Sequence, residues 1–353
     1  MRLFFSTYDP VAIRICVDLS LIDIGLAHEG PITAATLAEK STADVELVKR
    51  ILRILVPLEV FSQTSDGGYV VLPFGHLFAT GSPVRSGAIH FSHLFLATAS
   101  MPDYFASTGY KNPDDATTGP FSYAYQCMGS TYFDYLARPE NARFAQAFNE
   151  TMALQKTGEE GSFVASYPVS RLSIADPNRV FFVDVGGGVG HQLLKFRDHV
   201  ADVAGTLPGR LVLEDLPSVI STAIIDLPPE IDKIGHDFFQ PQPLSVQGAK
   251  AFYLRMILHD WPDIQATTIL KHIVDAMAED SVVLIHEVLL PEYGTGHFEA
   301  RMDWHLMNVG ALERTEEQWR KLVRSVGLEI RGVWWEQEQL QARRALTECG
   351  LKG

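Results

Sequence analysis

Residues 181–196 read FFVDVGGGVGHQLLKF and decide the fold of this chain. An apolar run typical of a β-strand leads into glycines at positions 186–188 and 190, and an amphipathic helical pattern begins directly after them. Such a turn lets the backbone approach a ligand closely at the N-terminus of a helix. Strand-like runs at 210–216, 249–258 and 281–290 alternate with helical or loop sequence. The alternation predicts an α/β fold, with a doubly wound, Rossmann-like parallel sheet over residues 171–353.

Composition excludes several classes of protein. The chain has 353 residues, of which 46% are hydrophobic and 20% are charged, an ordinary globular balance. Its formal charge of −14 opposes a broad nucleic-acid or anionic-membrane surface. The three cysteines have no metal-ligand spacing, and the sequence shows neither a secretion signal nor a long apolar run. We therefore expect a soluble cytoplasmic protein without a bound metal and without nucleic-acid or membrane partners.

Residues 1–80 have the pattern of a small winged-helix-like domain. Helical patterns at 11–26, 32–41 and 45–63 precede two β-prone runs joined by Asp66-Gly67, a hairpin signal. A winged helix invites a DNA-binding interpretation. However, this region carries six basic and nine acidic residues, which is not the basic footprint of a DNA-binding domain. A structural or dimerising role is therefore the better interpretation.

Residues 81–170 are rich in aromatic residues and methionine, and Pro/Gly punctuation divides them into helices and loops. We interpret this region as a helical linker. Phe144, Phe148 and Met152 follow one another at i, i+4 and i+8, so they share one face of a helix. The spacing alone favours a stripe that packs on the core.

Acidic residues surround the glycine loop. Asp184 stands just before the glycines, and the next strand ends in Glu214 and Asp215. Carboxylates at these strand ends suit an amide or ammonium group and the hydroxyls of an uncharged ribose. A glycine-rich loop by itself is typical of both dinucleotide and S-adenosylmethionine sites, so the loop leaves the ligand open.

Three further residues have the chemistry of acid–base catalysis. His259 follows the apolar run 253–258, at the carboxyl end of the sheet where such folds bind ligands. Glu287 ends the next strand-like run and can reach across to the previous one, while Asp260 or a later carboxylate can orient the imidazole. Glu313 begins a probable helix, where a capping role is as well supported as a catalytic one.

These motifs together resemble the class I S-adenosylmethionine-dependent O-methyltransferases of the caffeate/flavonoid type, in their fungal secondary-metabolism branch. VDVGGGVGH, LEDLP, HDFF, LRMILHDWPD, HEVLL and ERT occur in the family's order after a winged-helix-like start, and they span nearly the whole chain. The resemblance implies S-adenosylmethionine as cofactor, a small-molecule acceptor with a hydroxyl group, and a homodimer formed through residues 1–80.

The resemblance also implies roles for individual residues. His259 is the expected general base, flanked by Glu287 and Glu313. The expected cofactor contacts are Asp184, Gly186, Gly188, Gly190, Asp215, Asp237, Phe238 and Arg255, with Asp215 on the ribose and Asp237 and Phe238 beside the adenine. The expected substrate pocket comprises Phe144, Phe148, Met152, Met256, Trp304 and Asn308, which replaces the core-packing interpretation of the aromatic stripe. Trp304 stands where relatives often have a smaller or flexible apolar residue, so we expect a reshaped pocket.

A second function stays open at this point. Some fungal members of the family keep the cofactor but catalyse pericyclic or dehydration chemistry, and such members tend to lose the histidine base. His259, Glu287 and Glu313 are all present here. The sequence therefore favours methyl transfer over a pericyclase or cyclase on the same scaffold.

Overall fold

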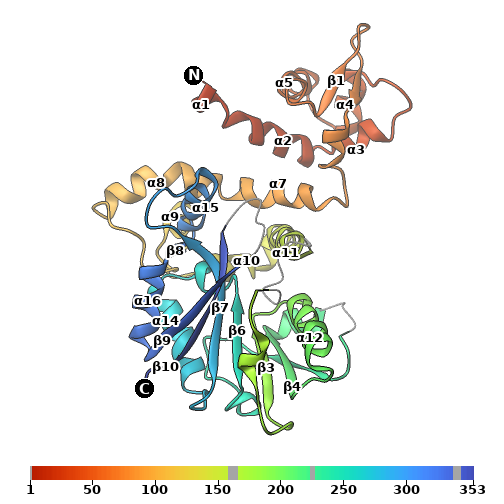
Figure 1. Cartoon of the computed structure of the whole chain (residues 1–353). Coiled ribbons are helices and arrows are strands. Elements are labelled where there is room, and N and C mark those ends of the chain that lie inside the picture. The colour runs from red at the N-terminus through yellow and green to blue at the C-terminus, as the bar shows by residue number, and fades with distance from the viewer. Residues whose placement is uncertain (1, 158–165, 223–226, 337–342) are drawn as a thin grey trace. The chain divides into compact units, whose positions relative to one another are not determined.

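The structure, a computed structural model, describes residues 2–157, 166–222, 227–336 and 343–353 (Figure 1). The chain forms two compact units. The first, here called the N-terminal unit, comprises Met1–Leu96 and Phe133–Gln155, and the second, the sheet unit, comprises Ala97–Tyr132 and Lys156–Gly353. The region 81–170 therefore contributes to both units. Within the described residues, no helix combines the length and apolar character needed to cross a bilayer.

The N-terminal unit is built from short helices and one β-hairpin. Its apolar core includes Leu37, Ile51 and Phe61, all fully buried or nearly so. The elements are α1 (Arg2–Phe5), α2 (Tyr8–Asp18), α3 (Leu21–Leu26), α4 (Ala34–Ser41), α5 (Val45–Leu55), β1 (Phe61–Gln63), β2 (Tyr69–Val71), α6 (Pro73–His76) and α7 (Pro83–His93), with most of α10 (Tyr132–Leu136) and α11 (Ala142–Thr157).

Local sequence signals explain where these helices begin and end. Thr33 caps α4, as its side chain accepts a hydrogen bond from the Thr36 amide, and Asp44 caps α5 in the same way. The apolar stretch 11–26 forms two helices rather than one, because Ser20 adopts a left-handed conformation with φ 51° between α2 and α3. The β1–β2 strands pair in antiparallel fashion around the Asp66-Gly67 turn, which confirms the predicted hairpin.

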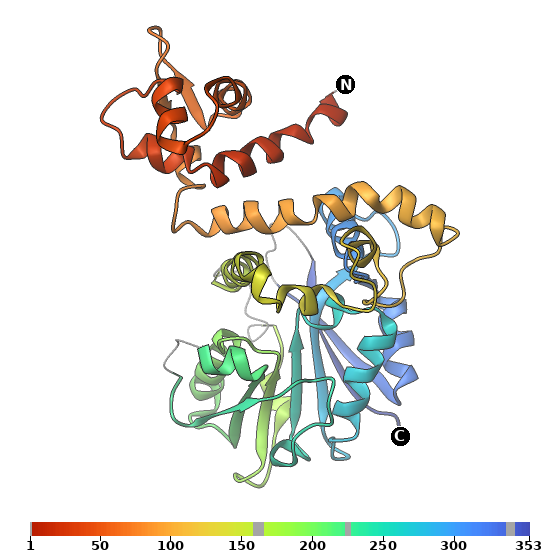
Figure 2. The ribbon, with the colours of Figure 1, turned by 180° about the vertical axis from the view of Figure 1, so that it is seen from behind.

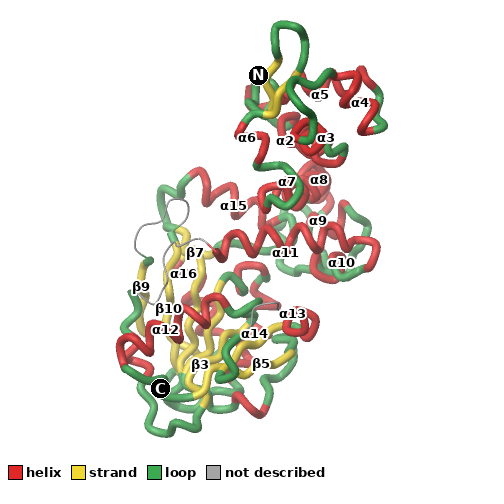
Figure 3. The backbone as a smooth tube through the Cα atoms, turned by 90° about the vertical axis from the view of Figure 1, so that its right-hand side faces the viewer, coloured by secondary structure: helices red, strands yellow, loops and turns green. Residues whose placement is uncertain are grey.

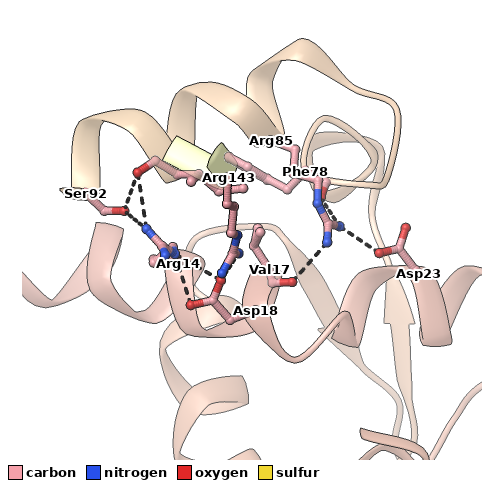
Figure 4. A network of polar contacts seen from close by, with 9 residues as sticks. Arg14, Val17, Asp18, Asp23, Phe78, Arg85, Ser92 and Arg143 are labelled. Atoms are coloured by element: carbon pink, nitrogen blue, oxygen red, sulfur yellow. Dashed lines mark hydrogen bonds and ion pairs between the residues drawn. The ribbon is translucent and has the colours of Figure 1, made fainter. Parts of the chain in front are cut away.

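Arginines tie helix α2 to the helices that pack on it (Figure 4). Arg14 on α2 donates to the Ser92 hydroxyl of α7 at 2.8 Å, and Arg143 of α11 pairs with the Asp18 carboxylate on α2. Arg85 of α7 donates to the backbone carbonyl of Val17 at 3.1 Å. These contacts fix α7 and α11 against the helical domain that precedes them in the sequence.

The sheet unit is centred on a mixed β-sheet surrounded by helices (Figures 2 and 3). The strands run in the order β5-β4-β3-β6-β7-β10-β9, with the short β8 beside β7. The elements are α8 (Phe95–Ser107), α9 (Pro120–Ala124), β3 (Val180–Val185), α12 (His191–Ala204), β4 (Arg210–Asp215), α13 (Pro217–Thr222), β5 (Ile231–Gly235), β6 (Ala251–Arg255), α14 (Asp263–Val274), β7 (Val282–Leu290), α15 (His297–Met307), β8 (Arg314–Thr315), α16 (Glu316–Ser325), β9 (Leu328–Trp335) and β10 (Arg344–Leu351).

The sheet is doubly wound, as the sequence predicts. From β3 the chain winds outward through β4 to β5, and then returns to the other side of β3 to form β6 and β7. Because parallel crossovers are right-handed, α12 and α14 cover opposite faces of the sheet. β10 pairs antiparallel with both β7 and β9, so one edge departs from the purely parallel sheet predicted. The reversal of strand order between β3 and β6 places the ligand site at the carboxyl ends of these strands.

Candidate active site

The glycine loop joins β3 to α12 with a backbone that only glycine adopts without strain. Gly186, Gly188 and Gly190 have φ values of 70°, 62° and 85°. A Cβ atom on Gly186 would lie 2.6 Å from the side chain of Ile257, so a larger residue would displace the segment that follows β6. Asp184 is buried under this loop, at the end of β3. The loop therefore forms a cradle at the carboxyl edge of the sheet.

Asp215 and Glu214 differ in what their carboxylates contact. Asp215 Oδ2 accepts a hydrogen bond from the Gly188 amide at 2.7 Å, which fixes the carboxylate beside the glycine loop. Glu214 is buried instead, and the amide nitrogen of Gln242 donates to its oxygens at 3.0 and 3.3 Å. Burial raises the pKa of Glu214 to about 7. Glu214 contacts the loop only through its backbone carbonyl, which accepts from the amides of Gly186 and Gly187, so Asp215 alone of the two offers its carboxylate to the loop.

The segment that follows β5 carries Asp237 and Phe238, and the Phe238 ring lies near the glycine loop. The Asp237 carboxylate accepts a hydrogen bond from the amide of Phe239 at 3.0 Å. The ring of Phe238 lies 3.7 Å from the position that a Cβ on Gly186 would take. Its centroid is 6.2 Å from that of Trp261, in an edge-on arrangement. The segment after β5 thus lies beside the glycine loop.

The imidazole of His259 is held by a carboxylate from a distant part of the sequence. His259 lies in the 3₁₀ turn Leu258–Asp260 that follows β6, and it is 7% exposed. Its Nδ1 is 3.1 Å from Glu313 Oε1. Because a carboxylate only accepts, Nδ1 carries the proton in this hydrogen bond and Nε2 is the atom that can exchange a proton. The Asp260 carboxylate lies 3.5 Å from Nε2.

Glu313 does not cap a helix, although its position in the sequence allowed that interpretation. Helix α16 is capped by Thr315, which forms a capping box with Gln318. The backbone amide of Glu313 is itself held by Asp303 Oδ1 on α15, at 2.9 Å. Its side chain contacts His259 instead, through Oε1.

Glu287 reaches across from β7 to the end of β6, as its position in the sequence predicts. Its Oε1 accepts hydrogen bonds from the backbone amides of Ile257 and Leu258, at 3.0 and 2.9 Å. The carboxylate therefore holds the turn before His259 rather than the imidazole itself. The preceding residue of this turn, Met256, has a φ of 52°, a strained conformation of the kind that gathers at functional sites.

Charge dominates the titration of this cluster. Burial disfavours the imidazolium of His259, but the carboxylates of Asp260, Glu313 and Glu287 outweigh burial and raise its pKa to about 10. Burial raises the pKa of Glu287 to about 7, and the nearby His259 charge opposes that rise. The carboxylates therefore favour the doubly protonated, positively charged form of the His259 imidazole at neutral pH.

The neighbouring His286 belongs to a different network. As adjacent residues of a strand face opposite sides of the sheet, His286 points away from Glu287. Its Nδ1 pairs with the Tyr253 hydroxyl at 2.7 Å, and its Nε2 lies 2.8 Å from Glu336 Oε1. These buried groups support β6 and β7 from within the sheet.

Several buried polar atoms near the strand ends lack a hydrogen-bond partner among the residues that the structure describes. Arg255 ends β6, and its buried Nε has no hydrogen-bond partner among the residues described. In the same described part of the chain, the second carboxylate oxygens of Glu287 and Glu313 are also buried without a partner. Buried polar atoms normally have partners, so their exceptions indicate groups that a bound molecule satisfies.

The residues expected to form the substrate pocket lie in both units. In the sheet unit, Trp304 on α15 is 58% exposed, whereas Asn308 is buried. The Asn308 amide donates to the His305 carbonyl at 3.0 Å and its oxygen accepts from Thr98 at 3.1 Å. Asn308 therefore fixes the end of α15 against α8. Met256 lies in the turn before His259.

The aromatic stripe of α11 lies in the N-terminal unit. Phe144 stacks on His93 with ring centroids 3.9 Å apart, and it also packs against the core of that unit. The Phe148 ring meets His90 edge-on, at 5.3 Å between centroids. Met152 follows on the same helix and is half-buried. Phe144 thus has the core contacts that its spacing alone suggests.

Sequence reasoning missed three residues that shape the site. Gln242 hydrogen-bonds Glu214, Asp303 holds the backbone of Glu313, and Arg314 donates to backbone carbonyls around His259. Arg314 had a visible signal, since a basic residue directly follows Glu313 in the ERT segment. Gln242 and Asp303 carry no motif that distinguishes them.

Comparison with known proteins decides the family. A model of the O-methyltransferase domain matches residues 113–329, and a model of the O-methyltransferase dimerisation domain matches residues 1–81. The chain belongs to the S-adenosylmethionine-dependent O-methyltransferases. Both the doubly wound sheet and the preceding helical domain with its hairpin agree with this membership.

Similar curated proteins come from fungi. The methyltransferase cfoC of Aspergillus candidus is 35% identical over 339 residues, covering 94% of this chain and 81% of that protein. The O-methyltransferase asqD of Emericella nidulans is 36% identical over 329 residues, covering 91% of this chain and 81% of the relative. The demethylsterigmatocystin 6-O-methyltransferase of Aspergillus parasiticus is 32% identical, covering 94% and 83%.

Solved structures confirm the fold. A protein described as a pericyclic reaction enzyme aligns with a TM-score of 0.84 and 30% identity, covering 100% of this chain and 88% of that chain. LepI in complex with SAM aligns with a TM-score of 0.83 at the same identity and coverage. The neighbours at this identity thus include a pericyclic enzyme and a complex with S-adenosylmethionine.

Proposed function

We propose that this protein methylates a hydroxyl group of a small aromatic or polyketide-type secondary metabolite, with His259 as the general base. The observation that carries the proposal is the 3.1 Å hydrogen bond between His259 Nδ1 and Glu313. This bond leaves Nε2 to take the proton of an acceptor hydroxyl at the carboxyl edge of the sheet.

The residues around the glycine loop suit S-adenosylmethionine. The loop between β3 and α12 offers a cradle that a Cβ on Gly186 would fill, and Asp215 beside it offers a carboxylate to ribose hydroxyls. Asp237 and Phe238 would flank the adenine, and the unpartnered Nε of Arg255, judged over the described chain, would donate to the cofactor. Asp184, Gly188 and Gly190 complete the proposed contacts. When bound, the cofactor supplies an electrophilic methyl group on its sulfonium sulfur.

His259 would act by removing the proton of the acceptor. A phenol with a pKa of about 10 is almost fully protonated at neutral pH, so its oxygen is a weak nucleophile. His259 Nε2 accepts that proton while Nδ1 stays bonded to Glu313, and the two carboxylates Glu313 and Glu287 stabilise the imidazolium. A positioned base of this kind contributes about 10²–10⁴-fold in rate.

The raised pKa of His259 shapes this chemistry. Because the surrounding carboxylates raise the pKa of the His259 imidazole, it is a stronger base than a free histidine, which favours proton transfer from a phenol. The same shift keeps the resting imidazole protonated at neutral pH, so the imidazolium loses its proton before each transfer. We therefore expect the rate to rise with pH well above neutrality.

Other parts of the proposal concern the acceptor and the assembly. Met256, Trp304 and Asn308 are proposed as acceptor contacts in the sheet unit. Phe144, Phe148 and Met152 of α11 are proposed as acceptor contacts in the N-terminal unit. We propose that the chain forms a homodimer through residues 1–80, in line with its match to a dimerisation domain. We further propose that it acts in the cytoplasm without nucleic-acid or membrane partners; its acidic charge of −14 supports this.

The proposal is tested with S-adenosylmethionine that carries a trideuterated methyl group and a panel of polyketide phenols. Methyl transfer predicts a product that contains the deuterated methyl group, detected by mass spectrometry, in an amount equal to the S-adenosylhomocysteine released. An enzyme that consumes acceptors without releasing S-adenosylhomocysteine is not a methyltransferase.

A pericyclase or cyclase is the second candidate function. It is supported by the fold match to a pericyclic reaction enzyme at 30% identity over the full chain. Such an enzyme converts its substrate into an isomer that carries no deuterium, and the cofactor is not consumed. The same experiment therefore distinguishes the two functions. The paired His259 and Glu313 favour methyl transfer, because an isomerisation needs no base for a phenolic proton.

A further inference from the structure

Arg314 is a buried cation directly behind the proposed base. It follows Glu313 in the sequence, lies on β8 and has an exposed fraction of 0%. Its guanidinium donates from Nη1 to the carbonyl of Leu258 at 2.9 Å and from Nη2 to the carbonyl of Trp261 at 2.8 Å. Nε and Nη2 also donate to Asp263 Oδ1, at 3.0 and 2.8 Å.

The hydrogen bonds of Arg314 hold the backbone on both sides of His259. Leu258 and Trp261 flank His259 and Asp260, so one planar group holds both ends of the turn that carries the imidazole. On the same side, the Leu312 amide donates to the His259 carbonyl at 3.1 Å. Residues 312–314 therefore contact the turn three times through backbone or guanidinium, and a fourth time through the Glu313 carboxylate.

Burying a guanidinium is costly, and at Arg314 four hydrogen bonds and the charges of nearby carboxylates, among them Glu287 and Glu313, offset that cost. The carboxylate that pairs with Arg314 belongs to Asp263, whose side chain is 60% exposed and thus partly screened by solvent. Two of its acceptors are neutral carbonyls. The guanidinium also lies 5.0 Å from the ring centroid of Trp319, which restricts its orientation. The fork geometry of arginine is what these separate acceptors require, and a lysine ammonium does not supply it.

We propose that Arg314 is a positioning residue, whose fork holds the turn of residues 258–261 so that the His259 imidazole meets Glu313 and the acceptor hydroxyl in the reactive orientation. The inference rests on the proposed function of His259. It adds a role for a residue that does not contact the acceptor. Since a displacement of about 1 Å in a catalytic group can cost about 10²-fold in rate, the loss of this fork is expected to act on turnover.

The test compares Arg314→Ala with two further variants. In Arg314→Ala, we expect kcat to fall by about 10–10²-fold, while the acceptor KM and the affinity for S-adenosylmethionine change by less than about threefold. Guanidinium chloride at low, non-denaturing concentration should restore a large part of kcat, because it can occupy the space of the lost side chain. Sodium chloride and methylammonium chloride at the same ionic strength should not.

Asp263→Asn is the matched control. It removes the charge partner of Arg314 but leaves the two carbonyl contacts, so kcat should stay within about threefold of wild type. Arg314→Lys keeps the positive charge but loses the forked set of hydrogen-bond donors. We expect its kcat to fall by about tenfold or more, because the charge of lysine does not replace those hydrogen bonds. This variant decides the question if Arg314→Ala does not fold.

Hydrogen exchange gives a readout that does not depend on activity. In Arg314→Ala, amides within 256–263 and 311–313 should exchange faster, guanidinium should slow them again, and the strands of the sheet should be unaffected. A folded Arg314→Ala with kcat within about twofold of wild type, or with faster exchange spread evenly over the sheet, overturns the proposal. If the wild-type protein transfers no methyl group, the proposed function fails on its own, and the exchange experiment still reports whether Arg314 holds the turn.

Discussion

Replacement of Glu313 by glutamine should shift the titration of His259. The amide oxygen of glutamine can still accept from Nδ1, which is 3.1 Å from the present carboxylate, so the imidazole keeps its orientation and loses only a charged neighbour. Unit charges about 4 Å apart attract by about 4 kcal/mol at an effective dielectric constant of about 20, equivalent to about 3 pKa units. Measured effects of a single opposite charge at such distances are about 1–3 units.

We therefore expect the pKa of His259 to fall from about 10 by about 1–3 units in Glu313→Gln. The carboxylates of Asp260 and Glu287 remain, so the pKa should not return fully to that of a free histidine. Because the neutral imidazole is the active form, the rise of kcat/KM with pH should be complete about 1–3 units lower than in wild type. The rate on the plateau should be lower, since the base is weaker.

The assay follows the ring carbons of ¹³C-labelled histidine by NMR between about pH 6 and about pH 11, in parallel with kcat/KM. The His259 signal is identified as the one missing in His259→Gln. Glu287→Gln should shift the pKa less, because that carboxylate bonds backbone amides and not the imidazole. The exposed Glu317→Gln is the matched control and should shift nothing. A His259 titration that is unchanged in Glu313→Gln, or that moves more in Glu287→Gln, would refute this account of the electrostatics.

Three further predictions concern the cofactor site, the acceptor pocket and acid stability. Gly186→Val, whose Cβ lacks space and whose backbone φ is 70°, and Asp215→Ala, which loses the carboxylate at the loop, should both weaken S-adenosylmethionine binding by about tenfold or more in calorimetry; unchanged affinity in either folded variant contradicts the site. Trp304→Ala should change which phenols are methylated and leave cofactor affinity intact, and unaltered acceptor selectivity would place the pocket elsewhere. Burial and the nearby Arg14 lower the pKa of His93 to about 4, so the unfolded chain takes up this proton first as the pH falls below about 6.5. The urea midpoint should therefore fall between about pH 6.5 and about pH 4, and His93→Phe should reduce that fall; an equally steep fall in the variant argues against it.

The fold was largely predictable from local patterns. The glycine loop after an apolar strand, the alternation of strands and helices, and the Asp66-Gly67 hairpin all describe elements that depend on neighbouring residues. The antiparallel edge formed by β9 and β10 was not predictable in the same way. Its strand order depends on pairing between residues 328–335 and 344–351 and on β10 pairing with β7, which no local pattern encodes.

The sequence predicted which residues belong to the candidate site but not which side chains contact one another there. The order of motifs brings His259, Glu287 and Glu313 to one sheet edge, but it does not say which carboxylate holds the imidazole. The structure shows Glu313 on the ring and Glu287 on the backbone of the preceding turn. The buried contacts of Glu214 and Arg314 also depend on packing between segments far apart in the sequence. Such side-chain directions follow from tertiary structure and not from spacing.

The central claim is that His259 removes the proton of the acceptor hydroxyl during methyl transfer. Its most direct test is the ratio of kcat/KM for wild type to that for His259→Ala, measured by S-adenosylhomocysteine release over a series of phenols of rising pKa. The account predicts a ratio of about 10² or more for phenols with a pKa of about 10, falling toward unity for phenols already ionised at the assay pH. Calorimetry should show unchanged cofactor affinity in the variant. A folded His259→Ala enzyme with the same ratio for every phenol, or with undiminished methyl transfer, would contradict the claim.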